Sequence, residues 1–499
     1  MNNNIYSSNA IIIRILYILL SIILWLSFFR IVLEGRLFFD GLIYSSISRN
    51  LSEGYGSIWR PHFATELFPV FAEHPPLAFW LQSIFFRIFG SETWVEKYFS
   101  TLILMASAVI LIGIWRRLTV SQPQVRGLAA YPLALALLSD PVSWSFANNM
   151  LEGTLFVFAS LAVLLILVAY DNDQHKLARY GLICCAGLAI TAAVLTKGPV
   201  GLFPLAAFGL HWLAIRRTSL GRAVFDSFCC GMIVLAAFAI LWIVPEARGY
   251  LIRYMDAQLV ASLSGARGNL GGGLQGVVIM MAAVALPLIV AVAIWATVRF
   301  SYDQTSRDHL SKKRRDVLPA ATFCLLLGLS ASLPILVSPR VSSFYFAPSV
   351  PFFALALALW SSPALFHLLG QMHRRWPAAQ SALLGISVGT FAIVLLASWG
   401  RLGGDREIIH DVDLIAQHVC EDMSQCRMSI AICDRSWQDW KLHSYLQRWN
   451  RISLRRQSSS AQFEFLIWTD TCYPYDGSEF TDTHLQLLNY RLLSFQSPN

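Results

Sequence analysis

The sequence contains few charged residues for its length. Only 14% of the 499 residues are charged and 56% are hydrophobic, whereas soluble domains carry roughly 25% charged residues. This shortage excludes an ordinary soluble protein. Long apolar runs recur between residues 10 and 399, and they are continuous, which favours helices over the alternating strands of a barrel. The sequence therefore predicts an all-α polytopic membrane protein.

Several sequence patterns are also missing. There is no glycine-rich loop of the Walker type, so no nucleotide site is predicted. No small-x-small cleavage site follows the first apolar run. We therefore interpret this run as an uncleaved membrane span and not as a signal peptide. No internal repeat is visible, although many transporters are built from inverted repeats.

The nine cysteines match no zinc-binding pattern. Five lie in apolar runs, where we expect inert core residues. The other four lie in the polar tail: Cys420, Cys426, Cys433 and Cys472. Disulfides form in oxidising compartments, so we expect one or two of them if the tail lies outside the cytoplasm. Their pairing stays open.

A membrane-spanning helix needs about 20 apolar residues. A shorter apolar segment, 77–89, is too short to cross at about 1.5 Å per residue, and we interpret it as re-entrant. Eleven runs are candidate spans, at residues 10–33, 97–115, 127–147, 153–170, 180–196, 198–215, 226–245, 276–298, 318–337, 344–369 and 380–399.

The net charge of +8 would suggest a nucleic-acid partner in a soluble protein. Here the basic residues gather in short loops between apolar runs, as the positive-inside rule describes, so we predict no nucleic-acid partner. With a cytoplasmic N-terminus, eleven spans place the C-terminus on the outer side. The same topology puts four basic clusters inside: Arg116, Arg117 and Arg126; Arg216, Arg217 and Arg222; Lys312 to Arg315; Arg374 and Arg375.

Apolar character stops near Arg401, which predicts a domain boundary. Residues 1–400 form the transmembrane domain, with loops 34–76 and 246–275 on the outer side. Residues 401–499 are expected to form a small soluble α/β domain. Its predicted elements are a strand at 428–433, a helix at 436–449 and a second strand at 463–470.

The stretch from Glu34 to Trp80 is the longest polar interruption in the first 170 residues. Because a loop so rich in ionisable groups is attached to a bilayer at both ends, we consider it the best candidate for the chemistry. Its ionisable residues include Asp40, Arg49, Glu53, Arg60, His62, Glu66, Glu73 and His74.

Five motifs follow one another along the chain. They are FFDGLIYSSISRNL from residue 38, FAEHPPLAFWLQSIFFRIFG from residue 71, NNMLEGTLFVF from residue 148, TKGPVGLFPL from residue 196 and SSFYFAPSVPF from residue 342. In these motifs the chain resembles the GT-C glycosyltransferases, specifically the bacterial protein O-mannosyltransferase and aminoarabinose-transferase-like group, over about residues 35 to 355. Enzymes of that group use polyprenyl-phosphate sugars. The resemblance implies the GT-C fold.

The chain departs from the family pattern at three places. Many relatives carry two adjacent acids in the first motif, whereas Gly41 follows Asp40 here. His74 stands where lysine is common, and its charge would depend on pH near neutrality. The loop 246–275 has no histidine, and Gln258 lies roughly where some relatives have a metal-ligating histidine.

The resemblance implies roles for individual residues. Asp40 and Glu152 are the catalytic candidates: Asp40 as the general base that accepts the acceptor's proton, and Glu152 as the group that orients the sugar or the acceptor. Glu73 is the candidate ligand of a divalent cation, the one cofactor considered. The donor phosphate is assigned to Lys197, His74, Arg340, Tyr345 and Arg267, with Arg253 as a further candidate.

Each of these residues also has a structural interpretation. Asp40 could be an ordinary residue of the membrane interface. Glu73 and His74 could simply begin a helix at the prolines that follow. Glu152 suits the first turn of a helix through the helix dipole. The Lys197 side chain could simply extend towards the membrane interface. An ionisable residue inside an apolar segment nevertheless suggests a functional role by default. A lysine beside Gly198 is suited to bind a phosphate as a point charge.

The sequence thus predicts an inverting glycosyltransferase of the bacterial inner membrane with a periplasmic C-terminal domain. It would move one sugar from a polyprenyl-phosphate donor of the undecaprenyl type to a periplasmic acceptor, which is a protein, lipid A or lipopolysaccharide, or another glycan. Its partners are this donor lipid, the acceptor and membrane lipid. The alternatives are a flippase or transporter for lipid-linked glycans, and a glycan ligase that uses a diphosphate carrier.

Overall fold

The computed structural model describes residues 2–171, 175–260, 273–301, 303–376, 378–398, 405–422, 426–459, 463–472 and 480–495. The chain divides into two compact units. The first, which we call the helical unit, comprises Met1–Ile31, Ser100–Ala147 and Leu151–Ala397. The second, the loop–tail unit, comprises Val32–Phe99, Asn148–Met150 and Ser398–Asn499.

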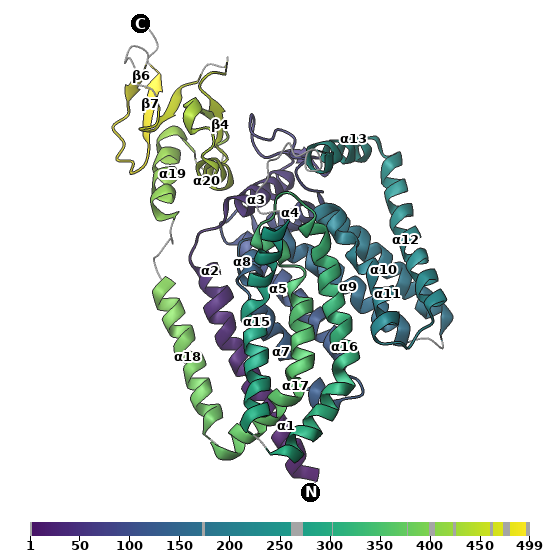
Figure 1. Cartoon of the computed structure of the whole chain (residues 1–499). Helices are drawn as coiled ribbons and strands as arrows, with labels where there is room; N and C mark the ends of the chain where they lie inside the picture. Colours follow the sequence, from purple (N-terminus) through teal and green to yellow (C-terminus); the bar gives the residue numbers. More distant parts are fainter. Residues whose placement is uncertain are drawn as a thin grey trace. The chain divides into compact units, whose positions relative to one another are not determined.

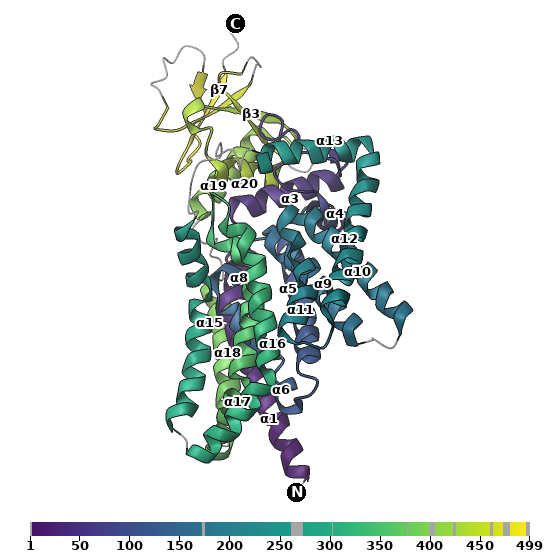
Figure 2. The ribbon, with the colours of Figure 1, turned by 45° about the vertical axis from the view of Figure 1, so that its right-hand side comes forward.

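Long apolar helices make up most of the helical unit, and α1, α15, α16 and α17 run side by side in both ribbon views (Figures 1 and 2). Within the described chain, nine helices are long and apolar enough to cross a membrane, so the chain is a multi-pass membrane protein. They are Ala10–Leu33 (α1, Asn2–Leu24, with η1, Trp25–Phe29, and α2, Arg30–Leu33), Val95–Leu118 (α5), Leu151–Asp171 (α9), Lys176–Ala214 (α10, Lys176–Lys197, with η2, Gly198–Leu205, and α11, Ala206–Ala214), Leu220–Ile243 (α12), Leu274–Ser301 (α15), Leu310–Leu336 (within α16, Gln304–Leu336), Val350–Arg375 (α17) and Ala379–Ser398 (α18).

The predicted fold class is confirmed, but the eleven predicted spans differ from the structure at two places. The predicted span 127–147 is two short helices, α7 (Ala130–Leu137) and α8 (Asp140–Ala147). They break at Ser139, whose hydroxyl donates to the Ala283 carbonyl at 2.8 Å, and Pro141 suits the first turn of a new helix. The predicted spans 180–196 and 198–215 lie in one 39-residue apolar stretch, Lys176–Ala214, which breaks at the predicted boundary, where α10 ends at Lys197 and η2 begins at Gly198.

The remaining elements are short. The 13-residue segment expected to be too short to cross is α4, and it is not among the nine long helices. The loop–tail unit contains α3 (Phe39–Ser52), the two-stranded hairpin β1 (Gly56–Ser57) and β2 (Arg60–Pro61), and α4 (Leu77–Phe89). The helical unit contains α6 (Pro123–Arg126), α13 (Pro245–Tyr254), η3 (Met255–Val260) and η4 (Ser343–Phe346).

The tail forms a five-stranded mixed sheet with the order β4-β3-β5-β7-β6. β3 pairs in parallel with β4 and β5, whereas β7 pairs antiparallel with β5 and β6. The predicted strands 428–433 and 463–470 and the predicted helix 436–449 are confirmed as β3, β5 and α20, although α20 begins later than expected. The tail elements are α19 (Arg406–Val419), β3 (Ser429–Ile432), η6 (Asp434–Ser436), α20 (Trp440–Asn450), β4 (Ser453–Arg456), β5 (Phe465–Trp468), β6 (Phe480–Asp482) and β7 (Arg491–Phe495).

The expected disulfides are present in the tail. Cys420 is bonded to Cys426, and Cys433 is bonded to Cys472. The second bond links the end of β3 to the residues after β5, and both cystines close segments of the same small sheet domain. The five other cysteines are free thiols. They were expected to be core residues, but of the five only Cys230 and Cys324 are buried, and Cys185 is exposed.

The tail shares its core with the first polar loop. Leu37 and Leu42 from the loop are buried in one apolar cluster with tail residues such as Ile409, Tyr445 and Leu492. The structure therefore groups residues differently from the predicted domains 1–400 and 401–499, because the loop 34–76 packs with the tail. Sequence composition could not indicate this packing, since some 300 residues separate the two segments.

Arginines reinforce the packing of loop and tail. Arg448, whose side chain is fully buried, donates to the Glu96 carboxylate at 2.6 Å and to the carbonyls of Ser91 and Glu92. Arg49 donates to the carbonyls of Gln447 and Arg448 at 2.8 and 2.6 Å. Each guanidinium thereby donates hydrogen bonds to backbone carbonyls that would otherwise be buried without a donor. A buried carbonyl without a donor lowers the stability of the fold.

Glu53 lies among three arginines. It accepts from Arg451 and Arg427 at 2.6 Å each, with Arg49 at 3.8 Å. Burial raises the pKa of this carboxyl, but the hydrogen bond from Arg451 and the charges of the arginines outweigh burial and hold the pKa of Glu53 below its usual value. Glu53 therefore stays ionised and holds the loop to the tail.

We expect Arg448→Ala to loosen the loop–tail unit. The substitution leaves Glu96 buried without its counter-charge, which typically costs about 3–5 kcal/mol. Hydrogen exchange of the peptides that cover residues 91–96 and α20 should accelerate. Arg406→Ala, which removes an exposed arginine from α19, is the matched control and should exchange like the wild type. Unchanged protection in Arg448→Ala would contradict the assigned role.

The loop–tail unit should also lose stability in acid through His443. Burial lowers the pKa of this imidazole to about 4, against about 6.5 in an unfolded chain. Between these values the unfolded chain binds a proton that the folded chain does not, so the free energy of unfolding falls as the pH falls, by about 2 kcal/mol at pH 5.

Hydrogen exchange of α20 at pH 7.5 and pH 5, corrected for intrinsic rates, measures this loss. We expect wild-type protection to fall about 30-fold more than that of His443→Gln, in which an amide can still donate to the Trp437 carbonyl as His443 does. Equal losses in the two proteins would assign the acid sensitivity to other groups.

Candidate functional site

A buried ion pair joins two of the predicted site residues in the helical unit. Glu152 is the second residue of α9 and Lys197 is the last residue of α10, and the Lys197 ammonium donates to Oε1 of Glu152. Only 1% of the Glu152 side chain and 14% of the Lys197 side chain are exposed. The structure thus brings together a carboxylate and a lysine that stand 45 residues apart in the sequence.

Gly198 determines where α10 ends and therefore where Lys197 lies. Its φ of 80° is a left-handed conformation that favours glycine. A Cβ at this position would also meet the Tyr254 hydroxyl at 1.9 Å. The following helix η2 folds back and packs closely on α10. A Cβ on Gly201 would lie only 2.5 Å from the backbone of Ala193, so glycine is needed at this contact. The helix break thus leaves the lysine side chain at the end of α10.

Aromatic rings cover the ammonium group of Lys197. Its nitrogen lies 4.8 Å from the ring centroid of Tyr345 and 5.9 Å from that of Phe344, both in η4. Phe344 in turn packs on Trp144 at 5.4 Å. A cation over an aromatic face is attracted by the ring quadrupole, so these contacts help to hold the ammonium group in place.

The pair leaves unused hydrogen-bonding capacity. A lysine ammonium has three N–H donors, and one is directed at Glu152. Oε2 of Glu152 is buried and has no hydrogen-bond partner among the described residues. A buried acceptor without a donor is costly, so a ligand that offers a hydroxyl to Glu152 and an anion to Lys197 would satisfy both groups.

Asp40 belongs to the loop–tail unit, where it is the second residue of α3 and is half-buried. The backbone around it is held by two asparagines. The Phe38 N–H donates to Asn148 Oδ1 at 2.8 Å, and Asn149 Nδ2 donates to the Gly41 carbonyl at 3.1 Å. These bonds fix the start of α3, and a carboxylate in the first turn is favoured by the helix dipole.

Steric contact explains why glycine follows Asp40. A Cβ at this position would lie 2.0 Å from the carbonyl oxygen of Asn148, so a second acid could not occupy it without a backbone shift. The departure from the family pattern noted in the sequence therefore corresponds to a close backbone contact within the loop–tail unit.

Glu73 and His74 are half-buried in the same unit. The His74 ring lies 5.8 Å from the ring of Tyr44 and 6.5 Å from that of Phe71, so it is part of an aromatic cluster. In the part of the chain that the structure describes, no group of three or more His, Cys, Asp or Glu residues could hold a metal ion. The assignment of Glu73 to a divalent cation stays a prediction.

The remaining predicted residues are placed separately. Arg340 is exposed in a turn, where the Ser338 hydroxyl donates to its carbonyl at 2.9 Å. Arg253 is exposed on α13, and Arg267 lies outside the described residues. Glu152, Lys197 and Tyr345 thus come together in the helical unit, whereas Asp40, Glu73 and His74 belong to the loop–tail unit.

Sequence reasoning missed several residues that shape these sites. Phe344 lies in the fifth motif beside Tyr345 but was not singled out as a site residue. Tyr254 carries no distinguishing pattern, because aromatic residues are common in membrane segments. Asn148 and Asn149 had a signal, since two adjacent amides directly before an apolar helix are unusual, but nothing in the sequence indicates that they hold the backbone of α3.

The ion pair of Glu152 and Lys197 predicts strong coupling in a double-mutant cycle. Lys197→Met leaves a buried carboxylate without a counter-charge and should cost about 3–5 kcal/mol. Adding Glu152→Gln should recover part of this loss, because the stranded charge is removed. Thermal denaturation of the purified variants in detergent measures the coupling, and additive effects of the two substitutions would show that the residues do not interact.

Comparisons with known proteins agree with the motifs. The family model described as dolichyl-phosphate-mannose-protein mannosyltransferase matches residues 73–243. A comparison with curated proteins finds no match.

Solved structures are similar over nearly the whole chain. The crystal structure of ArnT from Cupriavidus metallidurans in the apo state has a TM-score of 0.62 at 15% identity, covering 92% of this chain and 94% of that one. ArnT bound to undecaprenyl phosphate has a TM-score of 0.63 at 14% identity, covering 96% and 98%. The apo oligosaccharyltransferase of Archaeoglobus fulgidus has a TM-score of 0.53 at 12% identity, covering 91% and 69%. The resemblance predicted from the motifs is confirmed: the chain has the GT-C fold.

Proposed function

We propose that the protein is an integral membrane glycosyltransferase that moves a single sugar from a polyprenyl-phosphate donor to an acceptor, with inversion at the anomeric carbon. The observation that carries the proposal is the buried pair of Glu152 and Lys197 at a helix break, in a chain with the GT-C fold. A buried lysine with unused donors is suited to an anionic ligand, and a lipid phosphate is such a ligand.

Lys197 is the proposed principal contact of the donor phosphate. Its pairing with Glu152 orients the ammonium, and two of its N–H groups remain for phosphate oxygens. The undecaprenyl phosphate bound to ArnT supports a lipid of this class as the donor carrier. Tyr345 lies against the ammonium, and His74, Arg340 and Arg267 are the further proposed phosphate contacts.

Asp40 is the proposed general base. Its carboxylate accepts the proton of an acceptor hydroxyl while the acceptor oxygen attacks the anomeric carbon of the sugar. The bond from that carbon to the phosphate oxygen breaks, and its electron pair stays on the departing polyprenyl phosphate. The positive charge of Lys197 stabilises the additional negative charge on the phosphate. Glu152 holds the lysine and offers Oε2 to a hydroxyl of the sugar or the acceptor.

The topology supports a reaction on the outer face of a bacterial inner membrane. The two disulfides of the tail suit an oxidising compartment, which is the periplasm in this assignment. The basic clusters then lie in the cytoplasm, as the positive-inside rule requires. The acceptor is accordingly a periplasmic protein, lipid A or another glycan.

Donor consumption by purified protein in detergent tests the proposal, with a panel of polyprenyl-phosphate sugars. We expect the wild type to hydrolyse or transfer at least one sugar, and Asp40→Asn to be slower by a factor of about 10²–10⁴, which is typical of a lost general base. Glu92→Gln, which changes an exposed acid of the loop–tail unit, is the matched control and should keep wild-type activity.

Two other outcomes are informative. If Asp40→Asn is as active as the wild type, the enzyme class stands and Asp40 is not the base. If the wild type consumes no monophosphate sugar but binds polyprenyl lipids, the proposal fails in favour of a flippase, a transporter or a ligase that uses a diphosphate carrier.

A further inference from the structure

A cavity lies in the helical unit, between the end of α15, the start of α16 and the middle of α17. It has a volume of about 250 Å³, and its polar lining residues include Arg299, Gln304, Asp308, Ser311 and Arg314. Arg314 and Leu336 are 22 residues apart on α16, which is about 33 Å along a helix. Since η4 with Tyr345 follows the far end of α16, the cavity and the Lys197 pair are separated by about the thickness of a bilayer core.

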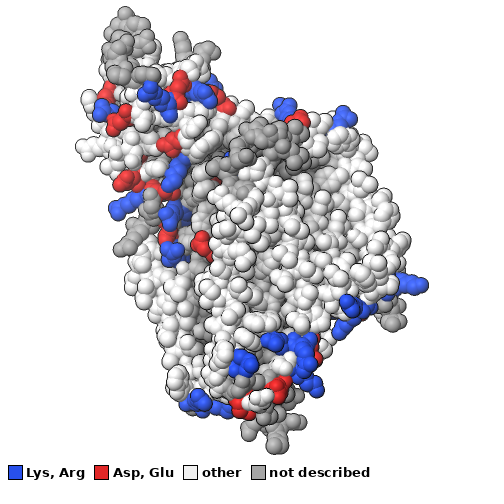
Figure 3. All heavy atoms as spheres, in the orientation of Figure 1, with Lys and Arg blue, Asp and Glu red and all other residues white. Residues whose placement is uncertain are grey.

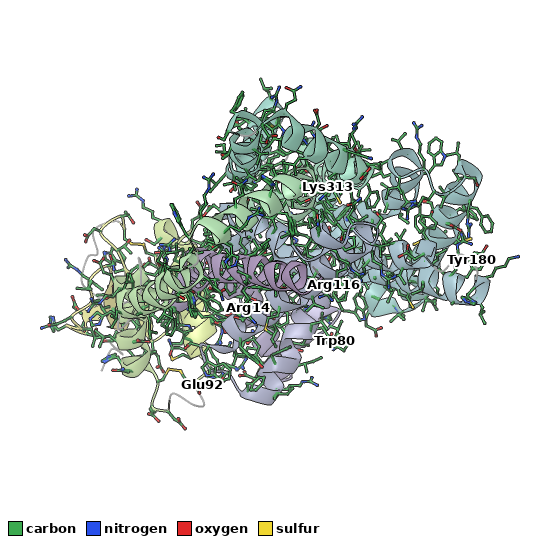
Figure 4. The ribbon with its side chains drawn as sticks, turned by 90° about the horizontal axis from the view of Figure 1, so that it is seen from below. Arg14, Trp80, Glu92, Arg116, Tyr180 and Lys313 are labelled. Carbon is green, nitrogen blue, oxygen red and sulfur yellow. A yellow bond between two sulfur atoms is a disulfide. The ribbon has the colours of Figure 1, made fainter. Side chains whose placement is uncertain are left out.

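The charges of this end of the helical unit are concentrated outside an apolar belt. Figure 3 shows Lys and Arg side chains gathered at the lower end of the helices, below a zone that is almost without charge. Figure 4 looks at this end from below and labels Arg116 of α5 and Lys313 of α16. The cavity therefore opens where a membrane helix bundle meets the headgroup region of one leaflet.

Two tryptophans form the apolar wall of the cavity. The rings of Trp295 and Trp360 lie 5.7 Å apart and are tilted by 34°. The guanidinium of Arg314 lies 6.0 Å from the Trp295 ring. Among the residues that the structure describes, neither Arg299 nor Arg314 has a carboxylate within ion-pair distance. Asp308, the one acid of the lining, reduces the charge of the two arginines to a net +1.

The surface of α15 continues the cavity into the apolar belt. Leu288, Val292, Trp295 and Arg299 are spaced by four, three and four residues, so they lie on one helix face. Leu288 is 37% exposed and Val292 is 40% exposed. Along this face the order is therefore apolar, then aromatic, then cationic, which is the order of acyl chain, interface and phosphate in a phospholipid.

We propose that this cavity binds an anionic phospholipid of the leaflet opposite the Lys197 site. Arg299 and Arg314 take the oxygens of the phosphodiester, as basic pockets between membrane helices do. Asp308 accepts hydrogen bonds from hydroxyls of the headgroup, and the Gln304 amide donates to them. An acyl chain lies along Leu288 and Val292. The proposal rests on this cavity alone and does not depend on the glycosyltransferase reaction.

Native mass spectrometry of the full-length protein in detergent, titrated with phosphatidylglycerol, tests the site. We expect the wild type to retain one phosphatidylglycerol. The Arg299→Gln/Arg314→Gln variant should bind it about 30-fold more weakly, since each basic residue near a headgroup contributes roughly one kcal/mol. Lys312→Gln/Arg315→Gln removes the same charge from exposed positions of α16 that do not line the cavity, and its affinity should stay within about threefold of the wild type.

Two results would overturn the proposal: equal loss in both double variants, which would indicate general attraction to the basic surface, or wild-type binding by the cavity variant. A free phosphate compound is the other possible source of the same chemistry. Inorganic phosphate and glycerol 3-phosphate, tested at the same concentration, should therefore fail to displace the lipid. Displacement would assign the cavity to a soluble phosphate compound instead.

A photoactivatable phosphatidylglycerol provides a test that needs no variant. In the wild type it should label peptides that contain Trp295, Arg314 or Trp360 in preference to those of α12, whose surface is largely exposed and apolar. Labelling spread evenly over α12 and α15 would mean that the cavity has no preference for the lipid and would contradict the proposal.

Discussion

A charged side chain that leaves water is stable only if an opposite charge takes the place of its hydration, because the cost of desolvation is several kcal/mol for each ion. The helical unit meets this condition at both ends of α10. Arg179 near its start pairs with Asp226 of α12, and Lys197 at its end pairs with Glu152 of α9. Neither partner of either pair can move alone without stranding a charge. The position of α10 is thereby fixed against two neighbouring helices, and with it the lysine assigned to the donor phosphate.

The sequence predicted those features that depend on local pattern. Continuous apolar runs indicated the membrane helices, and alternation indicated β3 and β5. Lys197 was singled out because a lysine within apolar sequence is rare. Its ion pair with Glu152 was not predicted. Packing sets how α9 and α10 are rotated about their axes, and the composition of the sequence does not show this rotation. For the same reason the pairing of the four tail cysteines stayed open. The break at Ser139 was missed although Pro141, which suits the first turn of a new helix, is a local signal for it. The roles of Asp40, Glu73 and His74 remain predictions.

The start of α3 shows how a departure from a family pattern can have a physical reason. Asp40 keeps its place in the first turn, but the next position approaches the carbonyl oxygen of Asn148 so closely that only glycine fits. The two asparagines then bond to the backbone on either side of Asp40. Backbone contacts thus hold the start of α3, and no negative charge stands at the residue after Asp40.

The packing of the first loop on the tail also has a consequence for biosynthesis. Glu53 and Arg451 are 398 residues apart, and at about 5–20 residues per second the ribosome needs roughly 20–80 s to make the chain between them. During that time the loop has already emerged, while the tail residues that pack on Leu37 and Leu42 and the two arginines that donate to Glu53 from the tail, Arg427 and Arg451, do not yet exist. The nascent loop must therefore wait in an unfolded state that chaperones and proteases can recognise. A chain that stops before its tail would carry this unmatched surface permanently.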